Sequence, residues 1–323
     1  MMSFLNTLQA AGFIVDRADP DGKWHRCKTV GKMHHKNGAY KLSICGTIGW
    51  YQDHAESTEV ATWKAGKDTE RPDPLVSQAR AKAAAEESKR LAHSIAIATV
   101  KANEYWRSCK PLRDSHNYLT SKLLTMQGCG NLREDADGWL VVPVEVDGKI
   151  ISLQRIDTDG SKRFWQGATV KVGCYILKPN RSSMTVLVEG LATGLAVFQS
   201  MPDTCVIVCF DCGNMKAVAT RLKLSGLVCV AADNDYKTLE KIGKNPGIEH
   251  GTKAAELIGC GLAYPEQIIG SDYADMYFEH LEQMIEKNEM LRRGQQTLEQ
   301  MRMAVGARIG RSIKSKMKFV SFK

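Results

Sequence analysis

The sequence has no hydrophobic run long enough to cross a membrane. Its 323 residues are 43% hydrophobic and 25% charged, which is ordinary for a globular chain, and no apolar stretch reaches the roughly 18–20 residues of a membrane span. The stretch MMSFLNTLQAAGF lacks the basic start and apolar block of a signal peptide. The ten cysteines are scattered, often inside apolar runs, as reduced and buried thiols are. We therefore expect a cytoplasmic protein with no membrane segment.

Two further absences narrow the class of protein. No G-x4-G-K-[ST] phosphate loop occurs, so the chain is not itself an ATP-driven helicase. Tight cysteine or histidine pairs of the kind that bind zinc are also missing. Cys27, His34, His35 and Cys45 contain the residue types of a zinc site, but the two cysteines are far apart in the sequence. We expect no zinc.

Acidic residues are almost absent from the last part of the chain. The net charge is +8, and residues 292–323 contain nine basic residues and only Glu299 as an acid, so they carry the whole excess. Such a tail favours an anionic polymer as partner; a solvated extension is the alternative. The basic residues are Arg292, Arg293, Arg302, Arg308, Arg311, Lys314, Lys316, Lys318 and Lys323.

The patterns predict a multidomain α+β/α/β protein. Residues 1–70 are expected to form a small β-rich domain, and residues 71–110 a helical linker. Residues 111–180 read as a basic β-rich segment. Residues 181–271 alternate short buried strands with helices, which predicts a parallel α/β sheet. Residues 272–323 are expected to be a helical, basic C-terminal region, by default two packed helices.

Local signals place several boundaries. Asp73-Pro74 is a helix start, and Lys110-Pro111 ends the same helix. Asp147-Gly148 predicts the turn of a hairpin between WLVVPVEV and KIISLQRI. After the strand LVCVAADND, the stretch KTLEKIGKNPGIEHG is expected to be a loop that leads into a helix, TKAAELIGCG.

Acidic residues stand where two of the expected strands end. Glu189 closes TVLVE and Asp233 closes VCVAAD, with Asp235 two positions later. Farther on, SDYAD offers Asp272 and Asp275. The carboxyl ends of parallel strands meet at one edge of a sheet, so these acids should converge there. Helix caps and turns are the alternative use of such residues. Clustered carboxylates favour Mg²⁺ or Mn²⁺.

These motifs resemble a known family. The E-G after one strand, the D-N-D after another and the later S-D-Y-A-D look like the three acidic motifs of a Toprim domain. Upstream, WLVVPV, DGKIISLQRI, DGSKRFWQGA and GCYIL resemble the basic half of the catalytic core in DnaG-type primases. The chain as a whole is similar to the Toprim primases of conjugative plasmids and bacteriophages. The likeness spans residues 20–280 and is most specific over 139–275.

The resemblance implies roles for the acids. Glu189 would be the first-motif acid, as a metal ligand or a general base. Asp233 and Asp235 would be the catalytic, metal-binding pair, and Asp272 the third-motif acid and a further metal ligand.

One position departs from the DnaG pattern. That pattern has an Asp four residues after the Glu, where this sequence has Thr193. The departure puts one ligand of a second metal in doubt, and Asp211 or Asp275 could compensate.

The basic β segment provides candidate nucleotide ligands. Arg155, Lys162, Arg163 and Lys171 precede the acidic sheet and could neutralise a triphosphate. The resemblance implies that Arg155, Lys162 and Arg163 face the catalytic crevice.

The expected function is synthesis of short RNA primers on single-stranded DNA from nucleoside triphosphates, by metal-dependent nucleotidyl transfer during replication. A separate replicative helicase or polymerase would be a partner, and a monomer is expected. A Toprim nuclease is the nearest alternative, because the same acids can cleave phosphodiesters. A topoisomerase would need a large further domain with a strand-cleaving tyrosine. A silent single-stranded-DNA-binding accessory protein is the alternative of another class.

Overall fold

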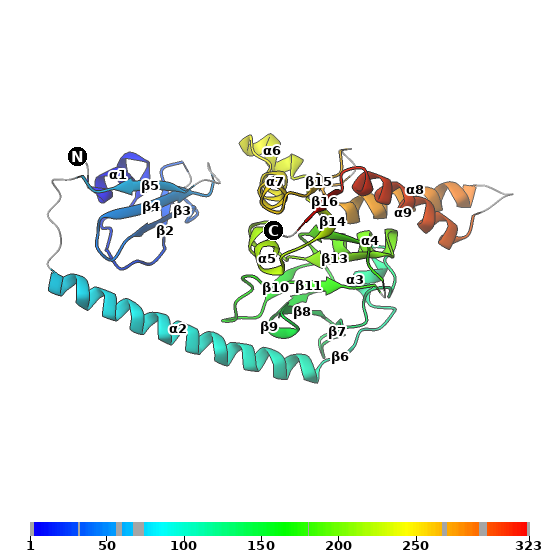
Figure 1. The fold of residues 1–323 in the computed structure, drawn as a ribbon, viewed down its shortest axis with the longest axis horizontal. Coiled ribbons are helices and arrows are strands. Elements are labelled where there is room, and N and C mark those ends of the chain that lie inside the picture. The colour runs from blue at the N-terminus through cyan, green and yellow to red at the C-terminus, as the bar shows by residue number, and fades with distance from the viewer. Residues whose placement is uncertain are drawn as a thin grey trace. The chain divides into compact units, whose positions relative to one another are not determined.

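The chain divides into two compact units, residues 1–93 and 94–323. The computed structural model describes residues 3–31, 33–55, 60–66, 74–179, 181–266, 270–290 and 296–321 (Figure 1). Helix α2 (Pro74–Ser108) runs across the division between the units. Asp73, expected at its start, lies outside the described residues, as do residues 67–72, so the boundary at residue 70 stays a prediction. None of the helices described is long and apolar enough to span a membrane.

The first unit contains an antiparallel sheet in the order β1-β2-β3-β4-β5 with helix α1 (Phe4–Ala10) packed on it. Phe4 and Leu8 of α1 share a hydrophobic core with Tyr40 and Leu42 of the sheet. Because side chains alternate between the faces of a strand, the basic residues Arg26, Lys28 and Lys41 fall on the face opposite this core, together with Trp50. The strands are β1 (Phe13–Ile14), β2 (His25–Thr29), β3 (Gly38–Leu42), β4 (Ile48–Asp53) and β5 (Ala61–Lys64).

The second unit contains another antiparallel sheet, in the order β10-β9-β8-β7-β6. Its central hairpin turns at Asp147 and Gly148, whose φ angles of 50° and 75° are those of a type I′ turn. Val146 pairs with Lys149, so the loop has two residues and the predicted hairpin is confirmed. The elements are β6 (Lys110–Pro111), α3 (Asn117–Thr120), β7 (Arg133–Glu134), β8 (Leu140–Val146), β9 (Lys149–Ile156) and β10 (Lys162–Phe164).

A mixed sheet with a parallel centre forms the rest of the second unit. Its order is β11-β13-β12-β14-β15, with β16 paired to β14, and the pairs among β12, β13, β14 and β15 are parallel. Helices α4, α8 and α9 lie against one face of this sheet, and α5 and α7 lie against the other (Figure 1). Each set of helices shares a hydrophobic cluster with the sheet. The strands are β11 (Tyr175–Leu177), β12 (Met184–Val188), β13 (Thr204–Val208), β14 (Gly226–Ala231), β15 (Gly261–Ala263) and β16 (Lys318–Val320). The helices are α4 (Leu191–Ser200), α5 (Cys212–Leu222), α6 (Tyr236–Ile242), α7 (Pro246–Ile258), α8 (Tyr273–Met290) and α9 (Leu298–Lys314).

The C-terminal region is integrated into this unit. Helices α8 and α9 pack together, as the sequence predicted, and Val305, Ile309 and Ile313 of α9 are buried in the core. The sequence did not predict β16, which pairs antiparallel with the start of β14. The charged tail is therefore not a free extension over residues 298–320. Arg292, Arg293 and Lys323 lie outside the described residues.

The loop expected over residues 237–251 is wrong, because two helices occupy most of that stretch. Helix α6 occupies residues 236–242, and α7 begins at Pro246 inside the stretch assigned to the loop. Asn245 caps α7 and Pro246 occupies its first turn, where the missing N–H of proline costs no hydrogen bond. Gly247 and Gly251, in the first two turns of α7, obscured the helical pattern in the sequence.

Candidate active site

Three neighbouring parallel strands each lead into a carboxylate. Val188 at the end of β12 pairs with Val208 of β13 on one side and with Ala231 of β14 on the other, so the three strands end level. Glu189 directly follows β12, and Asp233 follows β14 after one residue. The chain after β13 leads to Asp211. The parallel topology thus gathers acids from separate stretches of sequence at one edge of the sheet.

Burial and mutual repulsion raise the pKa values of these acids. The pKa of Glu189 is raised to about 7, first by burial and then by the charges of Asp211 and Asp235. The pKa of Asp233 is raised to about 8 by burial and by Asp272 and Glu189. Burial also raises the pKa of Asp272, with Asp275 as the largest neighbouring charge. Crowded carboxylates of this kind favour a bound cation.

The carboxylates differ in how they are held. Asp235 Oδ2 accepts a hydrogen bond of 2.8 Å from the Gly247 N–H. Asp272 Oδ1 accepts from the N–H groups of Ala274 (2.7 Å) and Asp275 (2.9 Å) at the start of α8. Asp233 Oδ1, in contrast, is buried with no hydrogen-bond partner among the described residues. An unpaired buried carboxylate oxygen is costly unless it takes a ligand.

Lys162 is the predicted cation that reaches the acids. Its Nζ lies 3.6 Å from the position that a Cβ on Gly190 would occupy. Its charge lowers the pKa values of Glu189 and Asp233, which opposes the effect of burial. Phe164, two residues along β10 and on the same face, packs edge-on against Phe210, with ring centroids 6.1 Å apart.

Arg155 and Arg163 lie on the other face of the same antiparallel sheet. They are cross-strand partners, one residue out of phase with Lys162. Arg155 forms an ion pair of 2.7 Å with Asp135, and its guanidinium carbon lies 4.5 Å from the ring centre of Trp139. Arg163 stacks on the same ring at 5.2 Å. The structure therefore brings only Lys162 of the three together with the acids, and nucleotide binding by the two arginines stays a prediction.

The structure distinguishes between the two residues, Asp211 and Asp275, that could replace the acid absent at Thr193. Thr193 is buried in α4, and its side chain lies close enough to Asp272 to lower the pKa of that carboxyl, against the effect of burial. Asp211 caps α5 through the Gly213 N–H at 2.7 Å and contributes the largest neighbouring charge at Glu189. Asp275 instead bonds to the Ser271 N–H at 2.8 Å. Asp211 is thus the candidate that lies beside the first-motif acid.

The donor set fits a divalent cation that keeps several waters. Within the ranges that the structure describes, no group of three or more His, Cys, Asp or Glu side chains is arranged as a ready-made metal centre. Mg²⁺ rarely needs one, because one or two carboxylates, water and substrate phosphate usually complete its coordination. Asp233, with its unpartnered Oδ1, and Asp235 could supply such ligands.

The residues considered for zinc have different environments. Cys27 lies in the core of the first unit, where burial raises the pKa of its thiol. Cys45 is exposed and bonds to the hydroxyls of Ser43 and Thr47, which lower the pKa of its thiol to about 7. His34 and His35 are exposed. The absence of zinc stays a prediction.

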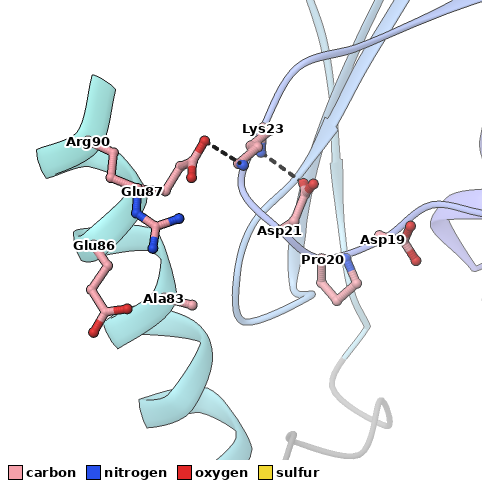
Figure 2. Close-up of a pocket in the computed structure, with 8 residues that line it drawn as sticks. All are labelled: Asp19, Pro20, Asp21, Lys23, Ala83, Glu86, Glu87 and Arg90. Carbon is pink, nitrogen blue, oxygen red and sulfur yellow. Dashed lines mark hydrogen bonds and ion pairs between the residues drawn. The ribbon is translucent and has the colours of Figure 1, made fainter. Parts of the chain in front are cut away.

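A cavity of about 530 Å³ lies within the first unit, whereas the acids belong to the second (Figure 2). Lys23 forms an ion pair of 3.1 Å with Glu87 there, and its backbone N–H bonds to Asp21. Acidic side chains outnumber basic ones in its lining, so it is a poor site for a phosphate. The cavity is lined by Asp19, Pro20, Asp21, Lys23, Ala83, Glu86, Glu87 and Arg90.

Residues 184–279 match the Toprim domain family. Two curated relatives, both named DNA primase TraC and both from Escherichia coli, are each 27% identical to this chain, over 278 and 286 residues. Each match covers 81% of this chain but only 26% and 19% of the relatives. The chain thus spans about a quarter or less of the length of these curated relatives.

Solved structures show a weaker likeness. The primase fragment of the bacteriophage T7 primase-helicase protein covers 55% of this chain and 78% of its own, at 13% identity and a TM-score of 0.39. The DnaG primase catalytic domain bound to ssDNA covers 67% and 82%, at 10% identity and a TM-score of 0.37. Both TM-scores are below 0.5.

Proposed function

We propose that this chain, whose residues 184–279 form a Toprim domain, is a DNA primase that makes short RNA primers on single-stranded DNA. The observation that carries the proposal is the set of carboxylates at the ends of β12, β13 and β14, joined by Asp272 and faced by Lys162. The relatives named DNA primase TraC support the same activity.

The residues of the site suit nucleotidyl transfer. A divalent cation, Mg²⁺ or Mn²⁺, held by Asp233 and Asp235 and completed by Glu189 or Asp272, would activate a 3′-hydroxyl and stabilise the leaving pyrophosphate. Glu189, with a pKa of about 7, can take up the hydroxyl proton on a carboxylate oxygen. Lys162 places an ammonium group beside Gly190, where it can neutralise a nucleotide phosphate.

The sheet of the first unit offers a surface for the single-stranded template. Arg26 and Lys28 of β2, Lys41 of β3 and Lys64 of β5 lie on the face opposite the hydrophobic core, by the alternation of each strand. Trp50 lies on this face, with the Lys41 Nζ 5.6 Å from its ring centre. Among the described strand residues, no acid shares the face. Cations around an aromatic ring suit a single strand, since bases stack on the ring.

Two alternatives predict different products. A Toprim nuclease would use the same acids to shorten DNA, and a silent accessory protein would bind DNA without turnover. The clustered acids argue against the second alternative, because a binder of polyanions gains nothing from buried carboxylates. The proposed enzyme would act in the cytoplasm as a monomer, with a separate replicative helicase or polymerase.

The test is incubation of the protein with single-stranded DNA, the four ribonucleoside triphosphates and Mg²⁺ or Mn²⁺, with separate labels on nucleotide and DNA. We expect short labelled RNA with intact DNA, and no product from Asp233→Asn or Asp235→Asn. Glu240→Gln is the matched control, because Glu240 is an exposed acid of α6. Shortened DNA without RNA would replace the proposal by the nuclease, and DNA binding without either product by the accessory protein.

A further inference from the structure

Asn245 lies just before α7 and bonds to two separate segments. Its Oδ1 accepts from the Ile248 N–H at 3.2 Å, which caps the helix, and from the Asp235 N–H at 3.0 Å. Its Nδ2 donates to Asn234 Oδ1 at 2.8 Å. The side chain is 7% exposed, so these bonds are sheltered from water.

Asn234, the middle residue of D-N-D, extends the connection in the other direction. Its Nδ2 donates to the Pro265 carbonyl at 2.8 Å, and its backbone N–H donates to the Ser271 carbonyl at 2.6 Å. Ser271 directly precedes Asp272, whose carboxylate is fixed by the first turn of α8. A continuous chain of hydrogen bonds therefore links Asn245 to the segment that carries Asp272.

The bonds determine how both amides are oriented. Two backbone N–H groups point at one atom of Asn245, which must be its oxygen because only an oxygen can accept both. Its nitrogen then faces Asn234 Oδ1, and the nitrogen of Asn234 faces a carbonyl that can only accept. Each amide has its matching partner, so the network has one consistent arrangement.

Gly247 completes the contact between α7 and the acidic loop. Its N–H donates to Asp235 Oδ2 at 2.8 Å. A Cβ at this position would lie 2.3 Å from the Asp233 carbonyl oxygen, closer than any side chain allows. The start of α7 therefore rests directly on the backbone that carries Asp233 and Asp235.

From this geometry we infer that Asn245 is a positioning residue of the active site. With Asn234 it forms an amide clamp that fixes the carboxylates of Asp233 and Asp235 relative to Asp272. The inference rests on the proposed metal-dependent function, because it assigns the clamp the task of holding the cation ligands in register. Groups that orient metal ligands typically contribute roughly 10–100-fold in metal affinity.

Asn245→Ser separates the clamp from the helix cap. Serine caps a helix about as well as asparagine, but its one hydroxyl cannot also bond to Asn234 and Asp235. We expect a melting temperature close to that of wild type, roughly 10–100-fold weaker Mn²⁺ binding measured by electron spin resonance, and faster hydrogen exchange of the Asp235 amide in metal-free protein. Asn288→Ser is the matched control, since Asn288 makes a comparable two-bond bridge to Gln296 on the α8 side of the unit.

A second variant protects the test against misfolding. Asn245→Asp keeps both acceptor bonds but replaces the donor to Asn234 Oδ1 by a carboxylate oxygen that repels it. The backbone amide of Asp235 should therefore stay protected, while the backbone amide of Asn234, which donates to the Ser271 carbonyl, should exchange faster. Unchanged exchange at Asp235 in Asn245→Ser and at Asn234 in Asn245→Asp would overturn the clamp. Unchanged Mn²⁺ affinity in Asn245→Ser, with faster Asp235 exchange, would overturn its role in metal binding. A wild-type protein that binds no Mn²⁺ would instead refute the metal site of the proposed function, and the exchange rates would still decide on the clamp.

Discussion

Replacing Asp233 by Asn should stabilise the metal-free protein at neutral pH while abolishing its metal-dependent activity. Burial and the charges of Asp272 and Glu189 raise the pKa of this carboxyl from 3.8 to about 8. Folding must therefore keep a proton on a group that the unfolded chain releases near pH 4. At pH 7 this penalty is at most about 4 kcal/mol, since one pKa unit corresponds to about 1.4 kcal/mol.

The pH dependence of this gain has a definite sign. Below pH 3.8 the carboxyl is protonated in both states, and wild type and variant should be similarly stable. Between pH 3.8 and about 8 the unfolded state binds fewer protons than the folded state, so the stability of wild type falls with pH relative to Asp233→Asn. Above that range the difference becomes constant.

Thermal unfolding in the presence of a chelator, at pH 4, 7 and 8.5, measures the effect. We expect a gain of about 2 kcal/mol at pH 7, less than the maximum, because the new amide is itself buried without a full set of partners. For a unit of this size that gain is a rise of roughly 4–8 °C in melting temperature. Adding Mg²⁺ or Mn²⁺ should raise the melting temperature of wild type but not that of Asp233→Asn, and Glu240→Gln should respond as wild type does. A variant no more stable than wild type at any pH would refute the reasoning.

Three further changes test other parts of the site. Lys162→Ala should raise the KM for nucleoside triphosphates about 10-fold, whereas the exposed Lys178→Ala should leave it unchanged in the same steady-state assay. Gly247→Ala should cost roughly 1–3 kcal/mol in chemical unfolding and weaken Mn²⁺ binding, because its Cβ would displace the Asp233 backbone; full Mn²⁺ affinity would contradict this. Trp50→Ala should weaken binding of a fluorescent single strand by about 1–3 kcal/mol, with Trp50→Phe largely restoring it, and equal binding by all three proteins would exclude the ring as a stacking surface.

The gathering of acids at one edge of the sheet could be predicted because short local stretches of sequence determine both the strands and the acids that follow them. TVLVE and VCVAAD are short apolar runs that end in an acid, and the alternation of strands and helices implies parallel pairing. The structure brings Glu189, Asp233 and Asp272 within electrostatic reach of one another. Asp211 was harder to assign, because Cys209 and Phe210 separate it from the end of β13 at Val208. Phe210 has a φ of 67°, an unusual backbone conformation for a bulky residue, directly before that acid.

Strand register, and not the basic composition of the segment, decides which face of the sheet each cationic side chain lies on. Arg155, Lys162 and Arg163 form one basic segment in the sequence, but side chains alternate along a strand. Arg155 and Arg163 share the face that carries Trp139, and Lys162 is turned toward Glu189. Which face would meet the acids depends on how two sheets pack, and that packing is a long-range property.

The many cations of the C-terminal region do not exclude that its helix α9 is part of the hydrophobic core. Arg308, Arg311 and Lys314 are exposed on α9, while Ile309 and Ile313 lie in the core of the second unit. A charged face and an apolar face are compatible on one helix. Truncating the chain before α9 would therefore remove core packing as well as charge, and single substitutions at the exposed cations are the cleaner test of DNA contact.

Sequence reasoning did not predict the contacts that hold the site in place. Asn245 lies in a stretch rich in glycine and charge, which is typical of a loop, and no local pattern reveals that its amide reaches back to Asn234 and Asp235. The raised pKa values explain why such a device is needed. Carboxylates that repel one another at the edge of a sheet would spread apart unless hydrogen bonds fixed them, and the backbone donors of α7 and α8 supply part of that restraint. Among the described residues Asp233 Oδ1 has no hydrogen-bond partner, and it is the oxygen that a bound cation would satisfy.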